Sequence, residues 1–128
     1  MKRTFTSITT LLLATYIGQA AESFRIYSPS SKNNTLWIIQ AIPKKDDLEL
    51  KVAKKVKLDF PGRVITTHPE MPLLYVTATR GDPGKVPGAV VHLKKDGSYL
   101  NHKRIHFNDG ACYLSIDKEN KHLSLIHI

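Results

Sequence analysis

An internal repeat of about 49 residues runs through this 128-residue chain and limits the folds that it can adopt. Shifting the sequence by that length superposes a charged turn and several apolar positions. The superposed features are Lys45-Asp46-Asp47 on Lys94-Lys95-Asp96, Leu50 on Tyr99, Val56-Lys57-Leu58 on Ile105-His106-Phe107, and Leu74 on Leu123. A repeat of this size indicates a fold of similar units that stack on one another.

Short apolar segments separated by turn residues fill each repeat. The predicted strands cover residues 24–27, 36–42, 48–58, 64–67, 73–79, 89–93, 99–107 and 111–116. Leu48, Leu50 and Val52 alternate with charged residues, which is the period of a half-buried strand, and Val56 and Leu58 continue the even-numbered apolar face. A helix over residues 48–58 is the competing interpretation, but the alternation fits a strand better than a period of 3.6.

Four short strands in a repeat of roughly 40–50 residues are typical of a β-propeller blade. One blade cannot bury both of its faces alone, so neighbouring blades cover it on each side. We therefore expect an all-β fold of four-stranded antiparallel blades. The alternative is a β-sandwich in which two hairpins match by coincidence.

Two stretches resemble the lactonase (6-phosphogluconolactonase) family. Residues 64–69 followed by 73–76 are similar to the inner hairpin of its blades, and residues 110–117 (GACYLSID) resemble its P-C-H-L-S-V-D stretch. The resemblance extends over roughly residues 24–123, and Tyr113 stands where the family usually carries histidine. It implies a seven-bladed propeller and hydrolysis of the ring ester of a sugar lactone.

Seven blades of about 49 residues need about 340 residues, so we expect this chain to be an N-terminal piece of a longer protein. Residues 21–122 would form about two blades: three strands of one, the whole of the next, and the start of a third. We expect residues 123–128 to be a non-native tail that resembles a translated sequencing adapter, with a genuine terminal strand as the alternative. Such a piece is expected to be inactive alone and to self-associate through open blade edges.

Residues 1–20 read as a secretory signal peptide. Lys2 and Arg3 precede a short apolar core around residues 11–13, and small residues favour cleavage between Ala20 and Ala21. The apolar run is too short to span a bilayer, which takes about 20 residues, so a membrane anchor is the weaker interpretation. The prediction is export to the periplasm or the exterior, with no membrane span in the mature chain. The single cysteine, Cys112, excludes a disulfide within the chain.

Candidate site residues come from the loops expected at one end of the blades, which are residues 59–63, 80–88 and 108–111. Arg63 and Arg80 present guanidinium groups suited to an acidic or hydroxyl-rich substrate. Asp109 or Asp59 is a candidate for orienting water, and Tyr113 is a candidate for contacting a substrate. Hydrolysis also needs an activated nucleophile and an oxyanion donor, and no matched pair is evident, so no catalytic residue is assigned.

The net charge of +8 falls to about +6 without the signal segment. Its lysines concentrate at positions 44, 45, 51, 54, 55 and 57. No aromatic residues are interleaved with them, so we expect a solvated outer strand rather than a nucleic-acid interface. The histidines lack carboxylate or cysteine companions at ligand spacing, so neither a metal nor another cofactor is expected.

Two functions follow from these observations. The first is an exported lactonase-like hydrolase with a sugar lactone as its small-molecule substrate. The second is a non-catalytic propeller of the cell envelope that binds a ligand or a protein.

Overall fold

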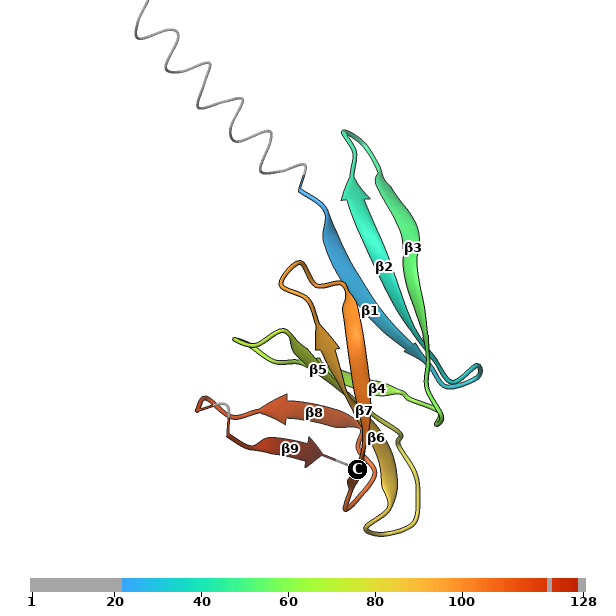
Figure 1. Ribbon diagram of the computed structural model, residues 1–128, viewed down its shortest axis with the longest axis vertical. Coiled ribbons are helices and arrows are strands. Elements are labelled where there is room, and N and C mark those ends of the chain that lie inside the picture. Colours follow the sequence, from blue (N-terminus) through green and yellow to red (C-terminus); the bar gives the residue numbers. More distant parts are fainter. Residues whose placement is uncertain (1–21, 120, 127–128) are drawn as a thin grey trace, which may run out of the picture.

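The computed structural model describes residues 22–119 and 121–126, which fold into antiparallel β-sheets and contain no helix. Nine strands of this part of the chain form three sheets in chain order (Figure 1). The proposed signal segment, with its cleavage site between Ala20 and Ala21, lies outside the described residues.

Sheet A contains three consecutive strands, β1 (Phe24–Ser30), β2 (Thr35–Pro43) and β3 (Leu48–Lys57), in the order β1-β2-β3. A polar turn joins β1 to β2, and Asn34 in it has a φ of +50°, a conformation that asparagine tolerates better than most residues. The strand predicted over residues 48–58 is confirmed, and the competing helix is wrong.

Sheet B contains the four strands β4 (Val64–Thr67), β5 (Leu73–Thr77), β6 (Val86–Leu93) and β7 (Tyr99–Phe107), in the order β4-β5-β6-β7. The prediction for residues 64–67 and 99–107 matches β4 and β7 at both ends. Strand β6 begins earlier than predicted because Val86, Pro87 and Gly88 extend its pairing with β7.

Sheet C pairs β8 (Tyr113–Ile116) with β9 (Leu123–Ile126). The residues predicted to be a non-native tail therefore contribute a strand, and its register sets Leu114 opposite Leu125. That residues 123–128 derive from a sequencing adapter stays a prediction.

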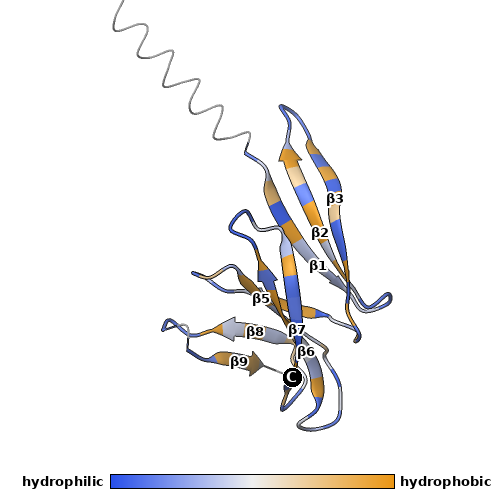
Figure 2. Ribbon diagram, in the orientation of Figure 1, coloured by the Kyte–Doolittle hydropathy of each residue, from blue (hydrophilic) through white to orange (hydrophobic). Residues whose placement is uncertain are grey.

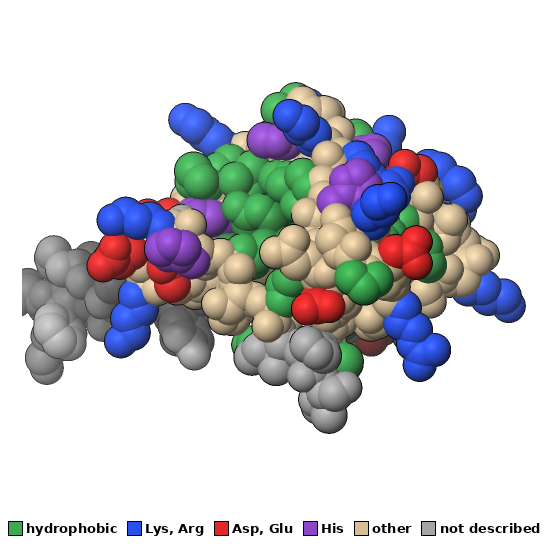
Figure 3. Space-filling view, turned by 90° about the horizontal axis from the view of Figure 1, so that it is seen from below, with side chains coloured by type: hydrophobic (Ala, Val, Ile, Leu, Met, Phe, Trp, Pro, Cys, Tyr) green, Lys and Arg blue, Asp and Glu red, His purple; other side chains and the backbone are tan. Residues whose placement is uncertain are grey.

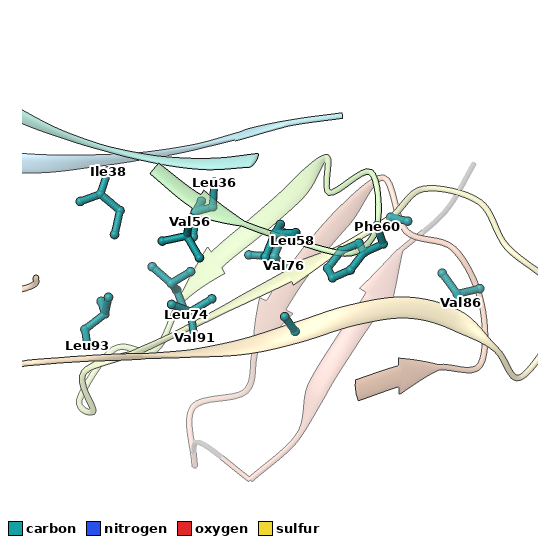
Figure 4. Close-up of a cluster of buried hydrophobic side chains, with 12 residues drawn as sticks. Leu36, Ile38, Val56, Leu58, Phe60, Leu74, Val76, Val86, Val91 and Leu93 are labelled. Carbon is teal, nitrogen blue, oxygen red and sulfur yellow. The ribbon is translucent and has the colours of Figure 1, made fainter. Parts of the chain in front are cut away.

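The hydrophobic core lies between sheets A and B, which pack face to face (Figure 4). Leu36, Ile38 and Val56 project from sheet A onto a surface of sheet B. That surface is lined by Leu74, Val76, Ala89, Val91 and Leu93. Leu58 and Phe60 of the connection to β4 extend the same cluster, so burial of apolar area fixes the two sheets together.

A β-bulge changes the direction of the apolar residues along β3. Ile38 pairs with Lys54 while Ile39 pairs with Val52, which leaves Ala53 between the two rungs. Because one extra residue inverts side-chain alternation, Val56 points into the core and is 3 % exposed, whereas Val52 points outward and is 53 % exposed. The prediction of one continuous even-numbered face is wrong, although β3 still alternates in hydropathy (Figure 2).

The repeat recurs in the strands, with a period that changes along the chain. Positions 64–67 of β4 correspond to positions 113–116 of β8, which is the shift expected from the sequence. The cross-strand pair Phe24↔Ala41 corresponds to Leu74↔Val91, which is a shift longer by one position. The single uniform shift expected from the sequence therefore assigns the residues of β1 and β2 to the wrong faces.

Candidate functional site

The loops that carry three of the predicted site residues meet at one end of sheet B. The backbone N–H of Arg63 donates to the carbonyl oxygen of Thr77 at 3.0 Å, which holds the β3–β4 loop beside the end of β5. Gly84 donates to the carbonyl oxygen of Asn108 at 2.8 Å, which joins the β5–β6 and β7–β8 loops. The three loops therefore lie together at this end of sheet B. The side chains of Arg63, Arg80 and Asp109 are exposed on them.

Gly110 of the β7–β8 loop lies directly against the backbone of the β5–β6 loop. A Cβ atom built on Gly110 would overlap the carbonyl group of Thr79 and lie 3.3 Å from the backbone nitrogen of Arg80. Only glycine fits this contact without displacing a loop, so Gly110 allows the loop that carries Asp109 to lie against the loop that carries Arg80.

The fourth predicted residue, Tyr113, lines a separate hollow between the sheets. Strand β4 contacts both β1 and β8, and the hollow lies where these strands come together. Its volume is about 320 Å³, and its lining residues are Tyr27, Ile65, Thr66, Thr67, Tyr113 and Leu114. Tyr113 is 59 % exposed there, while Leu114 beside it is buried.

Tyr27 is the fixed side of this hollow. Its hydroxyl donates to the carbonyl oxygen of Gly97 at 2.7 Å, across the boundary from sheet A to the β6–β7 hairpin. Partial burial raises the pKa of Tyr27 above its usual value, with Arg25 opposing the shift and Asp96 adding to it. The raised pKa keeps the hydroxyl proton of Tyr27 in place at ordinary pH, so the hydroxyl can donate to Gly97.

The residues that line this hollow carry either hydroxyl groups or apolar side chains. Two tyrosines and two adjacent threonines supply donors and acceptors, and no carboxylate or imidazole from the described residues lines the hollow. Among residues 22–119 and 121–126, no three histidine, cysteine, aspartate or glutamate side chains are grouped to hold a metal ion. The arrangement suits binding of a polar, uncharged molecule.

Asp59, considered for orienting water, has a structural partner instead. Its carboxylate forms an ion pair with Arg104 of β7, and the Arg104 guanidinium lies 5.3 Å from the centre of the Phe60 ring. This contact ties the β3–β4 loop to the outermost strand of sheet B, so Asp59 is engaged away from the hollow.

The structure adds residues that sequence analysis did not single out. Tyr27, Thr66 and Thr67 share the hollow with Tyr113, although β1 and β8 are far apart in sequence. A second hollow of about 180 Å³ lies between the sheets, where Arg25, Lys54, Lys94 and Tyr99 are among its lining. Only the repeat hinted at these groupings, since residues 64–67 and 113–116 occupy the same place in successive units.

The predicted lysine-rich strand lies at the edge of sheet A. Strand β3 pairs only with β2 in the described part of the chain, and its lysines at positions 51, 54, 55 and 57 are exposed. The Lys55 ammonium lies 4.7 Å from the centre of the Trp37 ring. Charges on an edge strand oppose pairing with other chains, which accounts for these lysines.

No helix in the described residues is long and apolar enough to cross a membrane. No protein-family model, curated protein or solved structure matches the chain.

Proposed function

We propose that this chain forms part of a β-propeller that binds a sugar lactone, or a related hydroxyl-rich small molecule, against β1, β4 and β8. The supporting observation is the hollow that Tyr27, Thr66, Thr67 and Tyr113 line together with Ile65 and Leu114. Sugars combine hydroxyl groups with apolar C–H faces, so they match a lining of threonine hydroxyls and tyrosine rings.

The propeller itself is supported by the order of the sheets. Consecutive strands pair in order within each sheet, and the strand pattern of sheet A recurs in sheet B. Sheets A and B pack face to face, and β8 of sheet C contacts β4 of sheet B. A four-stranded sheet between a three-stranded and a two-stranded one is what a segment cut from a ring of blades contains. Export of this propeller rests on the signal-like segment and is part of the proposal.

Hydrolysis is the activity that the lactonase-like segments imply. Water would attack the lactone carbonyl carbon, the ring C–O bond would break, and the ring oxygen would take up a proton to give a hydroxy acid. Arg63 and Arg80 lie on the loops at one end of sheet B and do not line the hollow. In this proposal a guanidinium stabilises the developing oxyanion of a lactone whose carbonyl group extends from the hollow toward those loops. The base that accepts the proton of water is not assigned to any residue of this chain.

A non-catalytic propeller is the second candidate, and one specific observation favours it. Tyr113 occupies the position of the family's histidine, and no imidazole or carboxylate of the described chain lines the hollow beside it. An imidazole is the side chain that most often serves as a general base near neutral pH, and a phenol replaces it here. Binding without turnover would fit this lining.

The product of the complete open reading frame should be tested against several sugar lactones, with binding measured by calorimetry and hydrolysis by acid release. Replacing Tyr113→Phe should weaken binding about fivefold, since a neutral hydrogen bond contributes about 1 kcal/mol. Tyr75→Phe, outside the hollow, is the matched control. Turnover that Arg63→Ala and Arg80→Ala reduce supports the hydrolase, binding without turnover supports the second candidate, and neither binding nor turnover contradicts both.

A further inference from the structure

The outer face of sheet A repeats the surface of sheet B that is buried in the core. Leu74 pairs with Val91 and Val76 pairs with Ala89, and these four side chains are covered by sheet A. In the preceding repeat, Phe24 pairs with Ala41 and Ile26 pairs with Ile39 in the same register. Ala41 is buried and Ile39 is half-buried, whereas Phe24 and Ile26 are exposed. The β1 half of this arrangement is therefore open, while the matching residues of β5, Leu74 and Val76, are covered.

This outer face of sheet A is a large exposed apolar surface. Phe24 is 50 % exposed and Leu50 is 57 % exposed, and Ile26, Leu48 and Val52 are exposed beside them. The bulge at Ala53 is what turns the β3 residues to this side. Exposed apolar patches of this kind mark sites of association.

Among the described strands, sheet A also lacks one that sheet B possesses. Strand β5 pairs with β4 on one side and β6 on the other, whereas β1, its counterpart, pairs only with β2 in the described residues. Strand β8 is the counterpart of β4 in the following repeat. Among the described strands, β8 pairs only with the short β9, in a two-stranded sheet. Two-stranded sheets are marginally stable in water, so this pairing is open to exchange.

We propose that sheet A is completed by a second copy of this chain, whose β8 pairs with the edge of β1 that no described strand occupies. The register follows from sheet B, where Ile65 pairs with Val76 and Thr67 pairs with Leu74. Replacing β4 by its counterpart β8, and β5 by its counterpart β1, sets Leu114 of one copy opposite Ile26 of the other. It also sets Ile116 opposite Phe24.

The far side of sheet B supplies the cover for the outer face. Leu114 is buried against the chain's own sheets, and β8 contacts β4, so a sheet that continues from β8 extends across sheet B. Tyr75, Val90 and Ile105 lie on that side and are partly exposed. Seen from below, the molecule carries a patch of hydrophobic side chains bordered by lysine, arginine and histidine (Figure 3). The contact joins different surfaces of the two copies, so it propagates head to tail.

Sedimentation velocity over a concentration series tests the association. The chain should sediment at twice the mass of one chain or more, and Ile26→Lys should return it to the mass of one chain. Met71→Lys is the matched control, because Met71 is 50 % exposed and lies in the β4–β5 turn outside the proposed surface. A single-chain mass at every concentration, or equal dissociation by both variants, would overturn the proposal.

Mixed single-cysteine chains test the register even if Ile26→Lys does not fold. In a Cys112→Ser background, a Phe24→Cys chain is mixed with an Ile116→Cys chain and oxidised glutathione. Two thiols lose two electrons and two protons to form the interchain disulfide, and the glutathione disulfide is reduced to two thiols. We expect a cross-linked dimer from this mixture and at least tenfold less from Phe24→Cys with Ser115→Cys, whose side chain lies on the other face.

Equal cross-linking by Ile116→Cys and Ser115→Cys, or none by either, would contradict the register. Neither readout involves a lactone. A negative result here therefore leaves the proposed ligand untouched, and a failed lactone assay leaves this proposal untouched.

Discussion

The hydroxyl of Tyr27 donates a hydrogen bond to the carbonyl oxygen of Gly97, 70 residues later in the chain, at 2.7 Å. Beside it, the Arg25 guanidinium hydrogen-bonds the Asp96 carbonyl oxygen and lies 3.9 Å from the Asp96 carboxylate. These contacts fasten β1 to the β6–β7 hairpin. Polar contacts at its margin thus reinforce the apolar packing between sheets A and B.

Removing the Tyr27 hydroxyl should loosen this junction. We expect Tyr27→Phe to lower the free energy of unfolding by about 1 kcal/mol, because the Gly97 carbonyl loses its partner. Urea denaturation measures the change. Tyr113→Phe, at an exposed tyrosine, serves as the control and should change stability little.

The same hydrogen bond predicts a loss of stability at alkaline pH. Burial raises the pKa of Tyr27 in the folded protein above its ordinary value of 10.0. The folded state then holds this proton more tightly than the unfolded state, so the contribution is complete below about pH 10 and is lost as the pH rises through the folded-state pKa. Denaturation from pH 8 to pH 11 should show a steeper decline for the native chain than for Tyr27→Phe, and parallel curves would contradict the assignment.

Replacing Gly97 by alanine should destabilise the chain for two reasons, backbone strain and a steric clash. Gly84 has the same kind of backbone conformation without the clash, so a comparison of the two positions separates the two effects. The φ of Gly97 is +85°, and an added Cβ would lie 2.8 Å from the Tyr27 hydroxyl oxygen. Gly84 has a φ of +75° and no atom within 4 Å of such a Cβ, so Gly84→Ala carries only the backbone cost of about 1 kcal/mol. Gly97→Ala should cost about 1–2 kcal/mol more by thermal or urea denaturation, and equal costs would show that the contact is unimportant.

The bulge in β3 predicts opposite outcomes for two valines of one strand. Val56→Ala should destabilise the chain by about 2 kcal/mol, since it removes buried methyl groups and leaves a cavity. Val52→Ala, earlier in the same strand, should change stability by less than about 0.5 kcal/mol because that side chain is exposed. Urea denaturation at low protein concentration avoids contributions from association, and similar losses at both positions would place Val52 in the core.

Gly110→Ala should separate the loops at the end of sheet B. The new Cβ would collide with the Thr79 carbonyl group, so we expect a loss of about 1–3 kcal/mol in stability and displaced backbone NMR signals around Arg80. Cys112→Ala, at an exposed position of the same loop, is the control. Unchanged signals around Arg80 would show that the loops do not touch in solution.

The positions of the strands could be predicted from the sequence, because alternation and turn residues are local properties. It identified β4 and β7 to the residue and predicted the all-β class. It also placed Arg63, Arg80 and Asp109 on loops that converge, since loops in equivalent positions of a repeat meet at the same end of the sheets.

The burial of each strand face, and the grouping of side chains from different sheets, depend on how the sheets pack and could not be predicted from local patterns. The bulge at Ala53 inverts the two halves of β3, and the change of the repeat period by one position moves Phe24 and Ile26 to the outer face. Side chains alternate at every position along a strand, so a single inserted residue reverses burial without changing the apolar pattern. Tyr27 and Tyr113 line the same hollow because of how sheets that are distant in sequence pack, and no local pattern specifies that packing.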